Sequence, residues 1–249
     1  MRVNTLVYVL LLFTALPSCS TFTGDTTSQD AQPSPDANQS LALKKKIMVL
    51  PFLNRTAYGG DELGQKVAGL IVDAMGQCED CIYVSPDDIE GHEAFSTAGS
   101  FYNYKTIFAK ARANGLSGVV LGTIDTLSMS ETGDEIGIFR SRQFKATTLV
   151  RLSIFDTSSE REVVSKTLKG DLSEERIRLP GDRSPAEEET ERGTAVVARA
   201  LDDVLKHFDD YARRIAWEGR IAKVDLRHYY IDAGEETGIA LGQLLKVFS

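Results

Sequence analysis

The sequence predicts an α/β fold, an α+β sandwich in which helices pack on a mixed sheet, with a small β module at the C-terminal end. Three patterns predict it. An apolar run over 46–52 precedes helically spaced apolar residues over 63–75, apolar and polar residues alternate over 144–155, and short strand-like segments follow Trp217. With 249 residues, of which 42% are apolar, the chain can bury the core of one large domain.

Strands and helices alternate through the first half of the predicted domain. We expect strands over 46–52, 81–84 and 118–124, and helices over 63–75 and 104–113. Residues 144–155 have the alternation of a half-buried strand, and Ser158 with Ser159 turns the chain into a second strand over 163–168. The hairpin that results makes the expected sheet a mixed one.

The longest predicted helix has the best-marked start. Ser184-Pro185-Ala186-Glu187 places an N-cap serine, a proline at the first helical position and a glutamate at N3. Apolar residues then recur in steps of three and four as far as Ile215. We therefore predict one continuous helix with an apolar stripe toward the sheet. Four aspartates are assigned to its solvated face rather than to a catalytic carboxylate pair: Asp202, Asp203, Asp209 and Asp210.

After Trp217 the pattern changes to short strands divided by glycine turns. We expect strands over 219–224, 229–232 and 244–248. So many strands in so short a stretch indicate a small barrel-like module, either incomplete or completed by strands from elsewhere. The predicted domains are therefore the α/β domain over 45–215 and the β module over 217–249.

The N-terminal residues have the pattern of an export signal. Arg2 precedes an apolar stretch over 6–16 that is too short to span a bilayer. Leu16-Pro17-Ser18-Cys19 resembles the lipobox of bacterial lipoproteins, at which the cysteine is acylated before cleavage. We predict a lipoprotein signal peptide over 1–18 and fatty acyl chains such as palmitate on Cys19. A plain signal peptide with an incidental cysteine is the alternative.

Residues 19–44 are mostly small and polar, so we predict a flexible tether there. Ser20 rather than aspartate follows the cysteine, and the resemblance to enterobacterial sorting signals then implies the outer membrane, with the body facing the periplasm.

The chain is acidic: it has 36 Asp and Glu residues against 28 Lys and Arg residues, which gives a net charge of −8. We expect no nucleic-acid partner, because such binding needs clustered basic residues.

Cys78-Glu79-Asp80-Cys81 is the one motif that invites a chemical interpretation. Two cysteines at this spacing in an oxidising compartment form a structural disulfide or a redox pair. Here they follow a predicted helix and have two carboxylates between them, which disfavours the reactive thiolate. We predict a local disulfide between Cys78 and Cys81; a free or metal-binding pair and a catalytic pair are the alternatives.

No other pattern predicts a catalytic, cofactor or metal site. Gly59-Gly60-Asp61-Glu62-Leu63-Gly64 lies between a strand and a helix, but its spacing fits no phosphate loop and its two carboxylates would repel phosphate. We expect a capped turn there. The three histidines, His92, His207 and His228, have no partner at metal-ligand spacing. We therefore expect a protein that is not an enzyme.

The order of the predicted elements resembles the family of the curli-secretion lipoprotein CsgG. Three blocks carry this resemblance: 47–54, 118–124, and the pair 150–156 with 163–165. A separate segment, 219–248, resembles the C-terminal module of the flagellar protein FlgT. The resemblance to CsgG extends to exopolysaccharide-secretion lipoproteins, to outer-membrane activators of penicillin-binding proteins and to the N-terminal domain of TolB. It implies the anticodon-binding-like α/β sandwich of that domain and a homo-oligomeric assembly at the outer membrane.

The sequence departs from the family where CsgG carries its membrane-crossing hairpins. The corresponding segments, 128–142 and 169–186, are rich in polar and charged residues, and we expect no lipid-facing apolar stripe in either. We therefore expect a lipid-anchored component that assembles or stabilises a secretion or appendage system of the curli, exopolysaccharide or flagellar type. An activator of peptidoglycan synthases and a subunit of an outer-membrane secretion pore are the alternatives.

Overall fold

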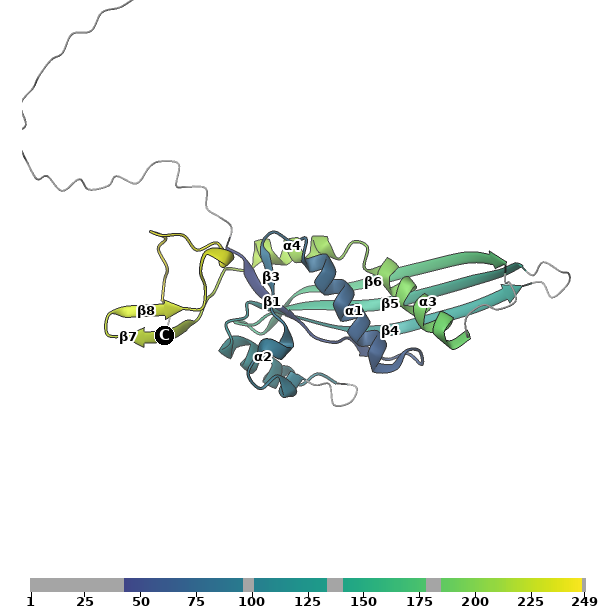
Figure 1. Cartoon of the computed structure of the whole chain (residues 1–249), viewed down its shortest axis with the longest axis horizontal. Coiled ribbons are helices and arrows are strands. Elements are labelled where there is room, and N and C mark those ends of the chain that lie inside the picture. The colour runs from purple at the N-terminus through teal and green to yellow at the C-terminus, as the bar shows by residue number, and fades with distance from the viewer. Residues whose placement is uncertain (1–42, 96–100, 134–140, 178–184, 248–249) are drawn as a thin grey trace, which may run out of the picture. The chain divides into compact units, whose positions relative to one another are not determined.

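A computed structural model describes residues 43–95, 101–133, 141–177 and 185–247. All of them belong to the second of two units of the chain, Leu41–Ser249. They form a mixed sheet with four helices packed on it and a separate two-stranded sheet, which confirms the predicted fold class. Figure 1 shows the helices beside the sheet and the small sheet after them.

The main sheet has the strand order β3-β1-β4-β5-β6. Its strands are β1 (Lys45–Val49), β3 (Cys81–Tyr83), β4 (Gly118–Gly133), β5 (Ser141–Asp156) and β6 (Arg161–Ile177), and the short β2 (Leu53–Asn54) pairs with β4. Strand β1 is parallel to both of its neighbours, whereas β4, β5 and β6 form an antiparallel meander. The sheet is therefore parallel at one edge and antiparallel at the other.

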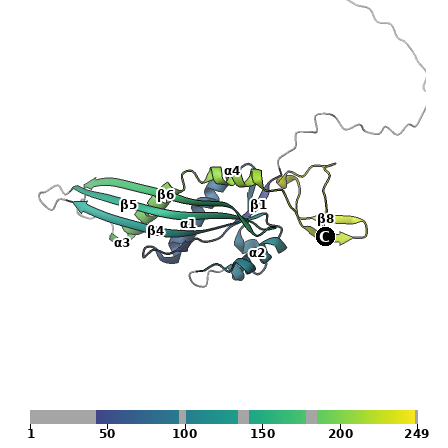
Figure 2. The same cartoon turned by 180° about the vertical axis from the view of Figure 1, so that it is seen from behind.

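The helices divide between the two faces of the sheet. On one face lie α1 (Gly60–Met75), α3 (Pro185–Ala200) and α4 (Leu205–Arg214), and they share a core with β1, β4, β5 and β6. The other face is covered near β1 by α2 (Tyr104–Ala113) and by the 3-10 turns η2 (Pro86–Asp88) and η3 (His92–Phe95). Seen from behind in Figure 2, the far ends of β4, β5 and β6 have no helix in front of them.

Close backbone approach positions α1 against the sheet. A Cβ atom at Gly64 would lie 2.0 Å from the Phe52 carbonyl oxygen, and one at Gly122 would lie 2.0 Å from the Phe52 ring. Both positions therefore require glycine. The helix starts at a turn, in which Gly59 adopts the left-handed φ of 70° and Asp61 and Glu62 occupy the first helical turn, but no side-chain hydrogen bond caps this start.

Three strands extend further than the sequence analysis predicted. Strand β4 continues beyond residue 124 to Gly133 and β6 beyond 168 to Ile177, paired residue by residue with β5. Parts of both segments that we compared with membrane hairpins are thus extensions of the body sheet. One side of these extensions packs toward α3: Met129 and Leu172 pack against the core, next to Phe144 and Ala146, which are buried on β5.

The prediction of one continuous helix up to Ile215 is also wrong. Helix α3 ends at Ala200 and α4 begins at Leu205. Between them, backbone N–H groups bond three residues back, as from Val204 to the Leu201 carbonyl at 2.9 Å, so the chain tightens to 3-10 geometry. Leu201 and Val204 stay buried through this turn, which keeps the apolar stripe on the sheet. Ser184, the predicted N-cap, lies outside the described residues.

The C-terminal segment contains fewer strands than predicted. Strands β7 (Ile221–Asp225) and β8 (His228–Ile231) form a hairpin, and the 3-10 turn η4 (Glu235–Thr237) follows. The third strand, predicted over 244–248, is not formed in its described part, 244–247. An extended segment becomes a strand only when a neighbouring strand satisfies its backbone groups, and these residues have no such pairing in the described chain.

Candidate interaction surfaces

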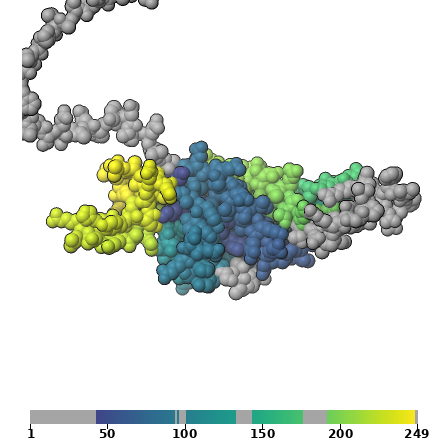
Figure 3. Space-filling view, in the orientation of Figure 1, coloured from purple at the N-terminus to yellow at the C-terminus, as the bar shows by residue number. Residues whose placement is uncertain are grey.

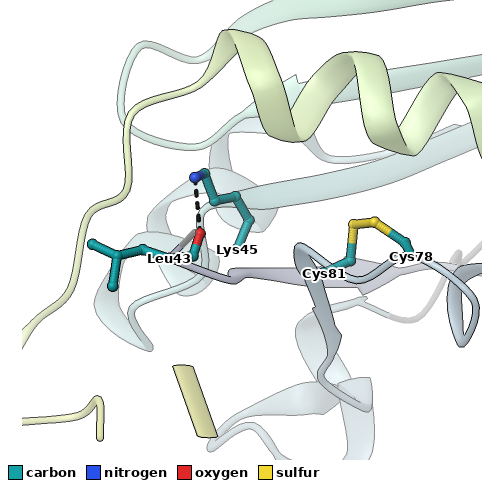
Figure 4. The surroundings of a disulfide bond; sticks show 4 residues. All are labelled: Leu43, Lys45, Cys78 and Cys81. Carbon is teal, nitrogen blue, oxygen red and sulfur yellow. Dashed lines mark hydrogen bonds between the residues drawn. A yellow bond between two sulfur atoms is a disulfide. The ribbon is translucent and has the colours of Figure 1, made fainter. Parts of the chain in front are cut away.

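The predicted site residues lie in two different parts of the chain. Cys19, the predicted acylation site, lies outside the described residues. A disulfide bond joins Cys78 and Cys81, between the end of α1 and the start of β3 (Figure 4). Nearby, the Lys45 ammonium donates a 2.9 Å hydrogen bond to the Leu43 carbonyl, and burial lowers the Lys45 pKa. Both sulfurs are held in a buried, cross-linked turn, which suits a structural role.

A groove of about 530 Å³ lies where β1 and β3 end. Its apolar lining comes from the end of β1, from α1 and from Phe95, and its polar lining includes Asp73, Asp87, His92 and Glu93. Open sheets of this kind bind ligands at the carboxyl ends of their parallel strands. The groove therefore has the location of a binding site, although no cluster of three or more His, Cys, Asp or Glu residues in the described part could hold a metal ion.

Tyr102 fixes the chain beside this groove. Its hydroxyl lies 2.7 Å from the Pro51 carbonyl oxygen and 2.8 Å from that of Gly122. Burial raises the Tyr102 pKa to about 12. The phenol therefore stays protonated and serves as a neutral hydrogen-bond donor that links the end of β1 to β4.

The uncovered face of β4, β5 and β6 forms a second surface (Figure 2). Strand pairing places alternate exposed residues of the strands on this face. Leu149 is its one large apolar residue with substantial exposure, at 36%. Most other members carry hydroxyl groups: Thr126, Ser128, Ser130, Thr132, Thr147, Thr167 and Ser173. Exposed charged side chains of both signs also lie on this face: Lys145, Arg151, Lys169, Asp171 and Glu175. The face is therefore polar, which suits a solvated surface.

The C-terminal segment forms the third surface and is attached to the body through polar contacts. The Lys46 ammonium lies 3.3 Å from an Asp232 carboxylate oxygen, and the other oxygen of that carboxylate accepts the Arg220 backbone N–H at 2.7 Å. The Lys44 backbone N–H donates to the Thr237 carbonyl at 3.0 Å. The base of the hairpin therefore lies beside the residues at which the described body begins.

Exposed apolar side chains gather in this segment. Twelve large hydrophobic residues are exposed in the described chain, and eight of them lie within 224–247: Val224, Leu226, Tyr229, Tyr230, Leu241, Leu244, Leu245 and Val247. Single exposed apolar residues are ordinary, but a concentration of them marks an interaction site. Figure 3 shows the segment in yellow, with the hairpin projecting from the rest of the body.

The sequence analysis did not identify these surfaces. It assigned 219–248 to the short strands of a small barrel-like module, incomplete or completed by strands from elsewhere, because a strand pattern does not identify what covers the strand. One local signal was available. Leu226 occupies a two-residue hairpin turn, where Gly, Asn or Asp is usual, and an apolar residue there has little to pack against.

Within the described ranges, which omit 1–42, 96–100, 134–140, 178–184 and 248–249, every helix is too short or too polar to cross a membrane.

Neither a family model nor a curated protein sequence matches the chain. Solved structures give remote matches. A hypothetical protein from Chlamydia trachomatis is 14% identical with a TM-score of 0.41, and the match covers 68% of this chain and 98% of that one. A PelC dodecamer from Paraburkholderia phytofirmans is 14% identical with a TM-score of 0.34, covering 65% and 89%. Lipoprotein GNA1162 from Neisseria meningitidis is 11% identical with a TM-score of 0.33, covering 67% and 99%. Bacterial lipoproteins are thus among the similar structures, but likenesses of this size assign the chain to no family.

Proposed function

We propose that the protein is a lipid-anchored, non-enzymatic component of the bacterial envelope. Acylation at Cys19 would hold it on the periplasmic side of the outer membrane, where it assembles or stabilises a secretion or appendage system. The observation that carries this proposal is the concentration of exposed apolar side chains in 224–247. A surface of this kind binds a partner, because exposing it to water without one is costly.

The segment after η4 supplies the surface for a protein partner. Leu244 and Leu245 are 97% and 42% exposed, and Val247 is 63% exposed. The segment has a strand-forming sequence but forms no strand in its described part. Such a segment can add to the exposed sheet edge of another protein, which would satisfy its backbone groups and bury its apolar side chains together.

The proposal includes neither a catalytic reaction nor a cofactor or metal. The groove at the ends of β1 and β3 then has a binding role, for which a lining of apolar and polar residues suffices. Self-assembly belongs to the proposal as well. We expect light scattering on the unacylated protein to return more than one subunit mass, and a strict monomer at high concentration would count against this part.

Two experiments on cells test the proposal. Labelled palmitate should enter the wild-type chain and not the Cys19→Ser variant, and the wild type should fractionate with the outer membrane. A photo-crosslinking residue at Leu244 should capture a secretion or appendage protein, whereas the same residue at Ser130, on the polar sheet face, should not. Absence of label or a cytosolic location would refute the anchor. Capture of penicillin-binding proteins would instead establish the activator of peptidoglycan synthases.

A further inference from the structure

The tip of the C-terminal hairpin holds a leucine in a conformation and an environment that are both unfavourable. Leu226 has a φ of 48°, a left-handed value that residues with a branched side chain rarely adopt. Its side chain is 97% exposed. Glycine would suit the turn better and would expose no apolar surface. Because Leu226 does not favour the folded state, its presence at the tip suggests a contact with another molecule.

The residues behind the tip continue this apolar surface. Val224 pairs directly with Tyr229, and Ile221 with Ile231, so these four side chains share one face of the hairpin. Val224 and Tyr229 are 58% and 63% exposed. An antiparallel sheet commonly packs one face on a core, and here that face contacts no core in the described chain.

The charge of the hairpin differs from that of the whole chain. Lys223 and Arg227 flank the tip and outnumber Asp225, the one acidic residue of 221–231, whereas the chain carries a net charge of −8. The Lys223 ammonium lies 5.7 Å from the centre of the Tyr230 ring. Apolar side chains, tyrosines and basic groups together are the composition that favours the interface of a bilayer.

The position of the hairpin matches the predicted reach of the tether. The base lies beside the first described residues, through the contacts of Lys44 with Thr237 and of Lys46 with Asp232. From Asp232 to Leu226 a strand spans roughly 20 Å. The tether that the sequence predicts over 19–44 would, as a flexible chain, have an end-to-end distance of about 25–30 Å. An anchor at Cys19 would thus hold the tip within reach of the membrane that holds the anchor.

We propose that the hairpin tip, led by Leu226 and backed by Val224 and Tyr229, inserts into the surface of the phospholipid bilayer. The leucine enters the acyl boundary, the tyrosines lie at the depth of the headgroups, and Arg227 and Lys223 pair with lipid phosphates. The tether argument rests on the proposed acylation of Cys19, which makes the contact intramolecular and raises its effective concentration. The hairpin would then orient the body on the membrane.

Vesicle binding by an unacylated chain tests the hairpin without the anchor. The mature chain carrying Cys19→Ser is sedimented with vesicles of phosphatidylethanolamine and phosphatidylglycerol. Leu226→Gly should weaken this binding about tenfold, since one buried leucine is lost. The same substitution relieves the left-handed strain, so it should not destabilise the fold. Leu149→Ser, which removes an exposed leucine from the polar sheet face, should leave binding unchanged. Equal binding by the two variants overturns the proposal.

Depth measurement on the acylated protein tests where the tip lies. Trp217→Phe removes the only tryptophan, and Leu226→Trp then places an indole at the tip. Brominated phospholipids should quench this indole strongly. They should quench a matched Ser130→Trp indole several-fold less, because that position lies about 40 Å along β4 from Gly118. Equal quenching at both positions overturns the proposal.

The two proposals fail in different ways. If palmitate does not label Cys19 but the unacylated chain still binds vesicles through Leu226, the anchor is wrong and the hairpin contact stands. If palmitate labels Cys19 but the Leu226→Trp indole is not quenched, the anchor stands and the hairpin proposal is overturned. Light scattering tests whether the hairpin tip binds a second copy of this chain instead of lipid. Loss of a dimer in Leu226→Gly, without quenching by lipid, would assign the tip to a second copy of this chain.

Discussion

The α/β body and the C-terminal segment use apolar residues in opposite ways. In the body, Phe208 and Tyr211 on α4 are fully buried against strands of the sheet. In the segment, Tyr229 and Leu226 are mostly exposed, and Thr237 is the one described residue after Ala212 that is buried. The amino-acid types are similar in the two regions. What differs is whether another element of the same chain covers the apolar face.

This contrast separates the region that stabilises the fold from the region to which binding is proposed. Burial of apolar surface stabilises the body, where helices cover both faces of the sheet near β1. The hairpin contributes almost no buried apolar surface and is held by polar contacts such as the Lys46–Asp232 ion pair. Its apolar face therefore remains available to bind. Substitutions in the two regions should separate folding from function.

The largest effect should follow from truncation in the body core. Phe208→Ala removes a fully buried ring and should lower the free energy of unfolding by about 3–5 kcal/mol. Tyr229→Ala, which removes an exposed ring, should change it by less than about 0.5 kcal/mol. Urea unfolding followed by circular dichroism measures both. Equal losses would mean that the hairpin is part of the core, and the comparison would fail.

The disulfide should have the next largest effect. It closes a loop of four residues, for which the chain-entropy relation gives a stabilisation of about 2 kcal/mol. Reduction of the wild type and the double variant Cys78→Ala with Cys81→Ala should therefore both lose about that amount. Intact mass should rise by two hydrogens on reduction. Identical masses with and without reductant would show that the purified protein holds no such bond.

The sequence was sufficient for elements that depend on local patterns. The helix predicted over 104–113 coincides with α2, and the strand predicted over 81–84 differs from β3 by one residue. Spacing of apolar residues decides both. The lengths of β4 and β6 were underestimated, because each polar extension is a strand only through its pairing with β5. The break between α3 and α4 was missed because neither Gly nor Pro marks it at 201–204.

The candidate surfaces were harder to predict than the fold. A strand pattern such as that of 244–248 indicates that the segment can form a strand and bury its side chains. It does not indicate that the same chain supplies a neighbouring strand. The groove beside Tyr102 brings together α1, β1 and the turns after β3. These elements are far apart in the sequence, so no motif predicts that they meet. The cysteine pair was accessible to prediction because its partners lie three residues apart. Acylation at Cys19 stays a prediction.

A smaller effect should appear in the pH dependence of the body. Burial lowers the pKa of His207, and Lys166 and Lys206 lower it further, against opposite contributions from Asp210 and Asp203. The unfolded chain binds this proton near pH 6.5, whereas the folded protein binds it only at lower pH. Stability is therefore full above about pH 6.5 and falls as the pH drops below it.

His207→Gln isolates this contribution. The variant should lose part of the stability decline between about pH 7 and pH 5, while the decline at lower pH from carboxylates such as Asp210 should remain. Urea unfolding at a series of pH values measures both slopes. A slope between pH 7 and pH 5 that is unchanged in the variant would show that His207 takes up its proton equally in both states.

A small effect on global stability should come from the contact that joins the two regions. Asp232→Asn weakens the ion pair with Lys46 and the bond from the Arg220 N–H, both at the base of the hairpin. Because this contact supports local rather than core structure, the free energy of unfolding should change by less than about 1 kcal/mol. Amide hydrogen exchange of β7 and β8 should nevertheless accelerate, while that of β4 and β5 stays the same. Asp225→Asn, at the tip, is the matched control and should leave both unchanged. Accelerated exchange throughout the sheet would instead show that the hairpin and the body unfold as one unit, and the division between stability and binding would not hold.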